Sequence, residues 1–333
     1  MKILAIESSC DETAAAVVED GRRVLSNVVA SQIEIHRRFG GVVPEIASRN
    51  HTLAIDNVVA QALEESGCGK AEIDAVAVTY GAGLLGALLV GVNYAKALAY
   101  AWKKPLYAVS HVRGHLAANY IDSDLEPPYL CLLASGGHTA LLQVRDYEDV
   151  VPLGKSGDDA AGEAFDKVAR VLGLPYPGGP EIQRLAREGK AVYKMPIPVF
   201  KSGETARFSY SGLKTFVINL VHGMEQRGET IPRADIAASF QECAVEQLFL
   251  GTRHAAESTG ARTVAIAGGV SANERLRARL DEWGESTGRR ICYPKLRSCT
   301  DNAAMIGAAA YFLIRSGAAS AGFGLDAKAP VAL

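Results

Sequence analysis

The sequence has no strong net charge and no C-x-x-C pair, and no secretory leader is expected at its start. Across 333 residues the formal net charge is −2, so no overall basic character predicts nucleic-acid binding. Any RNA contact must therefore come from local patches or from a partner. The six cysteines form no C-x-x-C pair, a pattern typical of a reduced cytosolic protein with buried thiols.

No hydrophobic run is both long and free of polar residues. The N-terminus has Lys2 and then only four apolar residues before Glu7, which is too short for a secretory segment. The most apolar stretch, 81–101, contains Asn93 and Lys96 and is rich in glycine and alanine, which favours a buried helix over a membrane span. The apolar fraction of 48% and the charged fraction of 22% are typical of a globular protein, and the length allows two domains.

The two halves of the chain repeat one order of expected elements. Each has a strand, a polar turn, a returning strand and a helix, followed by a strand, a glycine turn and a further helix. In the first half these segments are 2–7, 8–13, 14–19, 43–66, 73–79 and 81–101, the last of which contains both the glycine turn and the helix. In the second half they are 129–134, 135–138, 139–144, 160–172, 263–267, 268–269 and 273–283. The repetition predicts two related α/β lobes.

The lobe boundaries follow from this repeat. We expect an N-terminal lobe over 1–110 plus 301–325 and a C-terminal lobe over 111–300, with an insertion at about 193–235. The last helix is expected over Asp301–Arg315, capped by Thr300 or Asp301. A cleft between two such lobes suits a nucleotide, because hairpin turns can direct backbone N–H groups at phosphates.

Two glycine motifs resemble nucleotide-binding fingerprints. The run Gly81–Gly86 matches G-x-G-x-x-G, but no acidic residue that could hold a ribose occurs from Ala75 through Ile121. Close helix–strand packing explains these glycines better. The run Gly154-Lys155-Ser156 resembles the end of a P-loop, but Asp149 stands where the first glycine is needed.

The most informative local signal is His111-Val112-Arg113-Gly114-His115. On a helix, residues four apart share one face, so both imidazoles can reach one metal ion; two exposed or capping histidines are the plain alternative. A zinc protease would need Glu where Val112 stands. A third ligand must come from elsewhere in the chain, and Asp301 at a helix start is the candidate.

Several charged residues have both a plain and a functional interpretation. Asp11 and Glu12 are either solvated turn residues or paired carboxylates near phosphate or metal. Asp158 and Asp159 are expected to cap the following helix, and Asp166 to lie on its surface. Structural roles are expected for four other histidines: His36, His51, His222 and His254. Three arginines are expected to form a solvated helix face or part of a basic surface: Arg275, Arg277 and Arg279.

Motifs spread along most of the chain resemble those of one known family. These are 7–13 (ESSCDET), 40–49 (GGVVPEIASR), 111–115 (HVRGH), 135–139 (SGGHT), 162–167 (GEAFDK), 176–180 (YPGGP), 211–215 (SGLKT), 267–273 (AGGVSAN) and 299–302 (CTDN). In this order they resemble the motifs of the bacterial TsaD family, the tRNA threonylcarbamoyladenosine transferases.

The resemblance implies an actin-like fold of two lobes, a cytoplasmic location, and a metal, iron or zinc, held by His111, His115 and Asp301. It implies transfer of threonylcarbamoyl from threonylcarbamoyl-adenylate to the exocyclic amine of the adenosine 3′ of the anticodon, in tRNAs that read codons beginning with A. It also implies a related non-catalytic actin-like partner and a small ATPase. The implied substrate contacts are Ala134, Ser135, Gly136, Gly137, His138, Asp166, Gly179 and Asn273.

Three departures from the family pattern and three rival functions remain. Ala82 stands where proline is common, Arg113 where an acid is common, and Ala134 where an aliphatic residue is common.

An actin-like ATPase or kinase acting on a small molecule would not need the two histidines. A non-catalytic scaffold would not retain them together with Asp301, and Val112 weakens a metalloprotease.

Overall fold

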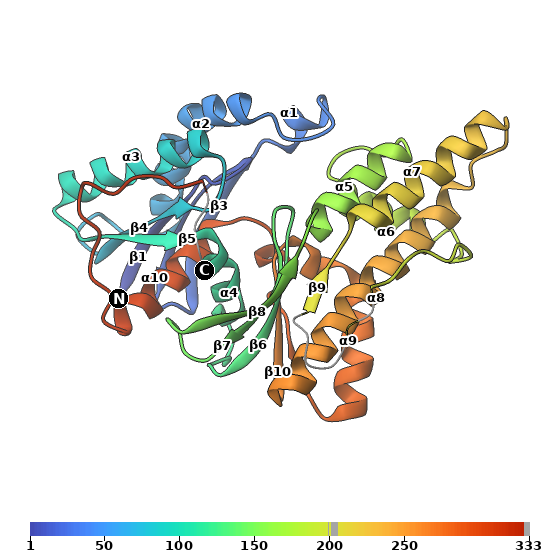
Figure 1. Ribbon diagram of the computed structural model, residues 1–333. Coiled ribbons are helices and arrows are strands. Elements are labelled where there is room, and N and C mark those ends of the chain that lie inside the picture. The colour runs from blue at the N-terminus through green and yellow to red at the C-terminus, as the bar shows by residue number, and fades with distance from the viewer. Residues whose placement is uncertain (199, 201–205, 330–333) are drawn as a thin grey trace. The chain divides into compact units, whose positions relative to one another are not determined.

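The computed structural model describes residues 1–198, 200 and 206–329, which form two compact units, described separately here (Figure 1). The first unit comprises Met1–Pro127, Asp146–Val150 and the chain from Pro294 onward. The second comprises Pro128–Arg145 and Val151–Tyr293.

The first unit is built on a five-stranded sheet in the order β3-β2-β1-β4-β5. β1, β2 and β3 pair antiparallel, whereas β4 pairs parallel to both β1 and β5. The strands are β1 (Lys2–Glu7), β2 (Glu12–Glu19), β3 (Arg23–Ser31), β4 (Ala75–Gly81) and β5 (Leu106–Ser110). The helices are α1 (Ile33–Arg37), α2 (Pro44–Ser66), α3 (Leu85–Trp102), α4 (His111–Ala117), η1 (Ala118–Tyr120), η3 (Leu296–Ser298) and α10 (Ala303–Arg315).

Helices cover both faces of this sheet because its strands are apolar on both sides. Leu4 and Ile6 of β1 pack into one core with residues of α2 and α3, whereas a Cβ on Gly307 of α10 would meet Ala5 and Val18 on the other face. α3 is the helix expected over 81–101, and one of its faces is buried. Within the described ranges, no helix combines the length and the hydrophobicity that a bilayer crossing requires.

The second unit is built on a six-stranded sheet in the order β11-β10-β6-β7-β8-β9. β6 and β7 form an antiparallel hairpin, and β10 runs parallel to β6. The strands are β6 (Tyr129–Ala134), β7 (Thr139–Val144), β8 (Val150–Ser156), β9 (Ala206–Phe208), β10 (Thr263–Ala267) and β11 (Arg290–Cys292). The helices are α5 (Ala161–Val171), α6 (Gly178–Ala186), α7 (Ser211–Gln226), α8 (Arg233–Thr259), η2 (Gly269–Ala272) and α9 (Glu274–Thr287).

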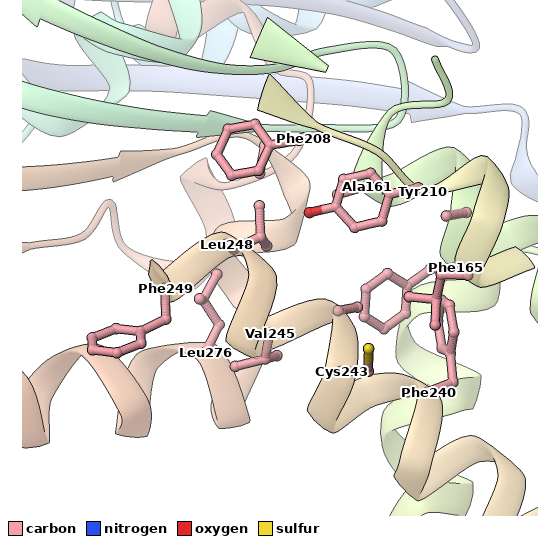
Figure 2. Packing of buried hydrophobic residues seen from close by; sticks show 14 of the residues in the cluster. Ala161, Phe165, Phe208, Tyr210, Phe240, Cys243, Val245, Leu248, Phe249 and Leu276 are labelled. Carbon is pink, nitrogen blue, oxygen red and sulfur yellow. The ribbon is translucent and has the colours of Figure 1, made fainter. Parts of the chain in front are cut away.

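The core of the second unit lies between its sheet and helices α5 to α9. Figure 2 shows aromatic and aliphatic side chains of this core, among them Phe165, Phe240 and Leu276. The expected insertion at 193–235 falls partly on residues 199 and 201–205, outside the described residues. Its described part contributes β9 and α7, and Tyr210 at the start of α7 is fully buried in this core.

The two sheets share one connectivity. In the first unit the order β3-β2-β1-β4-β5 matches β8-β7-β6-β10-β11 of the second, to which β9 is added at the edge. The duplication expected from the sequence is therefore confirmed at the level of strand order. The two compact units do not share the expected boundaries of 1–110 plus 301–325 and 111–300, because the first unit extends to Pro127 and includes Asp146–Val150 and the chain from Pro294. It thereby contains α4, which packs on α10: a Cβ on Gly114 would lie 2.6 Å from Ile306 Cδ1.

Two expected helix caps are wrong. Asn302, not Thr300 or Asp301, caps α10, because its Oδ1 accepts a hydrogen bond from the Met305 N–H at 3.1 Å. Asp158 and Asp159 do not cap α5: its N-cap residue is Ala160, and the Ala161 N–H donates to the Thr139 hydroxyl at 2.8 Å. Asp158 instead accepts hydrogen bonds at the start of α7, 2.8 Å from the Tyr210 N–H.

Candidate functional site

The glycine turn that follows β4 packs closely on the turn that follows β1. The Leu84 N–H donates to the Ser9 carbonyl at 2.8 Å, and a Cβ on Gly83 would lie 2.5 Å from that oxygen. These glycines do serve close packing, but Gly83 packs on a turn and Gly86 on Ser48 of α2, whereas helix–strand packing was expected. The turn after β1 is thereby held against the start of α3, and it carries Asp11 and Glu12.

Three possible metal ligands meet in the first unit. α4 places His111 and His115 on one face, and Asp301 lies one residue before the cap of α10. The His111 Nε2 and His115 Nε2 atoms lie 3.5 Å and 3.3 Å from Asp301 Oδ1. One ligand atom from each residue lies within 4.8 Å of the others, a spacing that a single ion can bridge. The sequence therefore named the three residues that the fold brings together.

The donor set fits a divalent metal. His115 is 1% exposed, and among the described residues neither of its ring nitrogens makes a hydrogen bond, although Nε2 lies within ion-pair distance of Asp301. A buried polar group without a partner costs about 1–3 kcal/mol, so a ligand at His115 Nε2 would relieve that cost. Two imidazoles and one carboxylate are a ligand set used for iron, and imidazole and carboxylate both bind zinc.

Glu7 is the residue that the sequence analysis missed. Its carboxylate is fully buried at the end of β1, with Oε2 3.1 Å from His111 Nδ1 and 2.7 Å from the Thr79 hydroxyl that donates to it. The Ser9 N–H donates to its other oxygen, and the Ser9 hydroxyl lies 3.0 Å from His111 Nδ1. Because an ionised carboxylate only accepts, His111 carries a proton on Nδ1, and a metal would bind at Nε2 in place of the second proton.

The electrostatics of this pocket favour positive charge. Burial lowers the pKa of His111, but the carboxylates of Asp301 and Glu7 outweigh it and raise this pKa to about 9. Burial raises the pKa of Glu7, but His111 outweighs it and the net change is downward. The Glu7 and Asp301 carboxylates both face the His111 ring, so a bound cation would be stabilised here.

Asp11 lies on the neighbouring turn, and Glu12 follows it as the first residue of β2. Asp11 is buried and Glu12 is half-buried, and Glu12 accepts a hydrogen bond from the Ser31 hydroxyl at 2.9 Å. Burial, and then the charge of Asp11, raise the pKa of Glu12 to about 9. In the absence of a cation Glu12 therefore holds a proton at neutral pH. The paired-carboxylate interpretation is thus better supported than two solvated turn residues.

His51 fixes this turn from α2. It is fully buried, with Nε2 2.9 Å from the Cys10 carbonyl and Nδ1 2.7 Å from the Thr13 hydroxyl. A carbonyl only accepts, so Nε2 carries the proton and Nδ1 accepts from Thr13. Its expected structural role is consistent with these contacts.

The residues proposed to contact substrate lie in the second unit. The turn between β6 and β7 is closed by a hydrogen bond from the Ser135 N–H to the His138 carbonyl at 2.8 Å. Gly136 and Gly137 at its tip are exposed, and a Cβ at either would meet nothing within 4 Å. Backbone N–H groups at such a tip are open to an anion.

Further expected contacts surround the carboxyl ends of β6 and β10. A Cβ on Gly268, after β10, would lie 2.4 Å from the Ala134 carbonyl oxygen, so the two strand ends touch. Ligands of α/β sheets commonly bind outside such strand ends. Asn273 caps α9 by accepting from the Leu276 N–H at 3.0 Å, and its amide donates to Gln241.

Asp166 links α5 to the glycine turn that begins α6. Its Oδ1 accepts a hydrogen bond from the Gly178 N–H at 2.7 Å, next to Gly179. A Cβ on Gly178 would lie 2.7 Å from the Asp166 Cα, so this approach requires glycine. The sequence had placed Asp166 on a plain helix surface; the fold instead joins it to the second motif that the resemblance implies.

The three arginines of α9 do not form a free basic surface. Arg275 and Arg279 pair with Glu242 and Glu246 of α8 at 2.6 Å and 3.0 Å, and the Arg277 guanidinium lies over the Tyr293 ring. All six cysteines are free thiols.

Comparison with known proteins agrees with these motifs. The family model of TsaD, tRNA N6-adenosine threonylcarbamoyltransferase, matches residues 23–308. A protein of that name from Clostridium perfringens is 55% identical over 317 residues, which cover 95% of this chain and 93% of that one. Its counterpart from Clostridium novyi is 54% identical over 314 residues, covering 94% and 92%.

Solved structures with low sequence identity share the fold. Full-length HypF, in its phosphate- and nucleotide-bound form, matches with a TM-score of 0.62 and 14% identity, over 96% of this chain and 47% of that one. Component A of (R)-2-hydroxyglutaryl-CoA dehydratase from Acidaminococcus fermentans matches with a TM-score of 0.54 and 15% identity, over 93% and 98%. The fold is the two-lobed actin-like α/β fold, and the chain belongs to the TsaD family of tRNA N6-adenosine threonylcarbamoyltransferases.

Proposed function

We propose that this chain transfers the threonylcarbamoyl group from threonylcarbamoyl-adenylate to the exocyclic amine of the adenosine 3′ of the anticodon, in tRNAs that read codons beginning with A. The 55% identity to a named transferase over 95% of the chain carries this proposal. The meeting of His111, His115 and Asp301 supports it, because the resemblance implies a metal held by these same residues.

The reaction needs positioning more than a strong nucleophile. The donor is a mixed anhydride: the adenosine nitrogen attacks the carbamoyl carbon, a C–N bond forms, the C–O bond to phosphate breaks, and AMP leaves with one proton released from the amine. An aromatic amine is a poor nucleophile, so holding both substrates in reactive geometry supplies much of the rate.

His111, His115 and Asp301 would hold a divalent ion, iron or zinc. Such an ion, when bound, would supply Lewis-acid polarisation of a donor oxygen. Glu7 would orient the His111 ring by accepting a hydrogen bond from its Nδ1–H, with 3.1 Å between Nδ1 and Oε2. Arg113, an unusual residue for the family at this position, donates to the carbonyls of Tyr147 and Glu148, so its charge is engaged away from the three ligands.

The second unit would hold the adenylate. The exposed N–H groups at Gly136 and Gly137 would bind its phosphate, with Ala134, Ser135 and His138 shaping the turn; loss of one such donor costs about 3 kcal/mol in transition-state stabilisation. Asp166 and Gly179 would hold the ribose and Asn273 would lie near the purine. This assignment is supported by the open turn tip and by the joined strand ends.

The amine proton would pass to the Asp11–Glu12 pair. A cation held near Asp301 would favour the ionised form of Glu12, so either member of the pair would be able to accept the proton. Asp11→Asn and Glu12→Gln, measured separately in single turnover, test this role. Unchanged rates in both variants would remove the pair from the chemistry.

We also propose that tRNA reaches the enzyme in the cytoplasm with help from a related non-catalytic actin-like partner and a small ATPase. The test combines the chain and these partners with tRNA, threonylcarbamoyl-adenylate and metal, followed by mass analysis of the tRNA nucleosides. Modified adenosine from wild type but not from a His111→Ala/His115→Ala variant is expected.

Two other outcomes would contradict parts of the proposal. Equal product from both proteins would keep the transferase and discard the metal site. No product from either protein, with tRNA and partners shown to be competent, would favour an actin-like kinase acting on a small molecule.

A further inference from the structure

The turn after α1 presents an exposed aromatic residue and an exposed arginine that are adjacent in sequence. The Phe39 side chain is 55% exposed, and Arg38 next to it is also exposed. The preceding Arg37 is held by Glu34 at 2.9 Å. No carboxylate in the described part of the chain pairs with Arg38, so its charge is available to an outside anion.

The backbone of this turn is fixed by its own hydrogen bonds. The Phe39 N–H donates to the His36 carbonyl at 2.9 Å, and the Gly41 N–H donates to the same oxygen at 3.2 Å. Gly40 and Gly41 have φ of 67° and 153°, values that favour glycine and let the chain turn tightly after the ring. A ligand would therefore meet a ring on an ordered turn, with a low entropy cost of binding.

A buried histidine anchors the turn to the first unit. His36 is fully buried, and its Nδ1 accepts a hydrogen bond from the Val43 N–H at 3.2 Å. Its Nε2 must then carry the proton and donate to Gln32 Oε1 at 3.3 Å. Burial lowers the pKa of His36, which keeps the ring neutral and this anchor in place at neutral pH. The side chains of residues 38 and 39 point outward from a fixed base.

The pairing of ring and cation matters more than exposure. Single exposed apolar side chains are common and need no explanation. Among other exposed apolar side chains, Leu53 is aliphatic, and the Tyr100 ring lies edge-on to Phe323 at 5.7 Å. An exposed ring next to an unpaired cation is the combination that binds unpaired bases and their backbone, by stacking and by phosphate contact.

We propose that Phe39 and Arg38 bind the single-stranded anticodon loop of the tRNA substrate, Phe39 by stacking on an unpaired base and Arg38 by contacting a phosphate. This inference rests on the proposed function, which supplies the RNA. With a net charge of −2 the chain needs local cationic contacts to hold RNA at all.

Binding of two RNAs by the full chain tests the proposal. One RNA is an anticodon stem-loop and the other a fully paired duplex of equal length. The variants are Phe39→Leu, Phe39→Trp and Arg38→Gln. Matched controls are Tyr100→Leu, an exposed aromatic on α3, and Arg315→Gln, an exposed arginine at the end of α10.

The two residues should leave different signatures. Phe39→Leu is expected to weaken stem-loop binding about 5- to 20-fold at every salt concentration, because stacking is lost. Phe39→Trp should bind the stem-loop as wild type does. All three variants should bind the paired duplex with the affinity of wild type. Arg38→Gln should make the salt dependence shallower, by about 0.7 in the slope of log K against log salt. Both controls should behave as wild type.

Three results for Phe39→Leu would overturn the inference. The first is unchanged stem-loop binding, and the second is an equal loss of affinity for the duplex. The third is RNA binding as in wild type combined with weaker binding of the non-catalytic partner protein. Single-turnover transfer by the wild type, measured first, separates this inference from the proposed function. No transfer by the wild type would reject the function itself, whereas transfer with unchanged KM for tRNA in Phe39→Leu would reject only the stacking role.

Discussion

At the scale of single residues, Glu7 sets the state of a proposed metal ligand from the end of β1. Its carboxylate makes three contacts, with the Ser9 N–H, the Thr79 hydroxyl and His111 Nδ1, and no part of it is exposed. A carboxylate behind a ligating histidine fixes the ring and increases its basicity. Glu7 therefore acts through His111 as a positioning residue.

Glu7→Gln is expected to lower metal affinity about 10- to 100-fold, because an amide oxygen accepts the Nδ1 proton more weakly than a carboxylate. Competition with a chromogenic chelator measures the affinity, and circular dichroism checks the fold. Glu72→Gln is the control, because it alters an exposed carboxyl that pairs with Lys2, a residue of the strand that carries Glu7. This variant should bind metal as wild type does. Equal affinity in both variants would contradict the role of Glu7.

Glu12 gives the metal-stripped protein a pH dependence of known sign. Burial and Asp11 raise the pKa of Glu12 to about 9 in the folded protein, above its unfolded pKa of about 4.5. The contribution of Glu12 to the free energy of unfolding is therefore complete below pH 4.5 and is lost as pH rises through about 9. Glu12→Gln removes this loss. The variant should gain free energy of unfolding over wild type as pH rises from about 5 to about 8.5, by at most about 1.4 kcal/mol per pH unit.

Urea unfolding of both proteins in the presence of a chelator measures that difference. The chelator is required because a cation near Asp301 would favour the ionised form of Glu12. A constant difference between the two proteins across this pH range would show that Glu12 ionises normally in the folded state.

At the scale of elements, Asp158 connects the strand β8 to the helix α7. Its carboxylate accepts from the Tyr210 and Ser211 N–H groups at 2.8 Å and 3.3 Å, and from the Ser209 and Ser211 hydroxyls at 2.6 Å each. Some burial raises the pKa of Asp158, but these hydrogen bonds outweigh it and lower the value to about 2. The start of α7 depends on this one side chain.

Asp158→Ala is expected to destabilise the protein by about 1–2 kcal/mol at neutral pH, in the range of lost helix caps. Because the folded pKa is lowered, the difference from wild type should persist down to about pH 4 and shrink as pH falls towards about 2. Denaturant unfolding measures it. Glu188→Gln, at an exposed position in the same unit, serves as the control, and a loss of equal size there would contradict the capping role.

Local sequence predicted the buried strands well and the caps poorly. The bounds of β6, β7 and β10 were predicted because each is an apolar run that ends at a turn. β3 and β8 were missed because many of their residues are partly exposed, without a clean alternation. Asp158 binds a helix about 50 residues later in the chain, and no local pattern encodes such a contact.

The same limit applies to the candidate site. His111, His115 and Asp301 were found by spacing and resemblance, but Glu7 looked like the polar end of a strand. Its partner His111 is 104 residues away, and only the parallel pairing of β1, β4 and β5 brings α4 to that strand end. A buried charge at a strand end is recognisable once the sheet order is known.

At the scale of the whole molecule, charge balance limits what the chain does alone. Its 35 basic and 37 acidic side chains nearly cancel, and in α8 and α9 arginines are paired with glutamates. Phosphate neutralisation supplies most of the affinity of a protein for nucleic acid. The cationic contacts of this chain are therefore expected to be few, in keeping with the proposed help from a partner protein.

The isolated chain is accordingly expected to bind tRNA modestly, with an affinity that falls as salt rises from about 50 to about 200 mM. Adding the non-catalytic partner and the ATPase should tighten binding and steepen the salt dependence, because more phosphates are then contacted. Fluorescence anisotropy of labelled tRNA across a salt series, with and without the partners, measures both quantities. Tight binding by the chain alone that does not respond to salt would contradict a partner-assisted RNA surface, since it would require contacts that do not depend on displaced counterions.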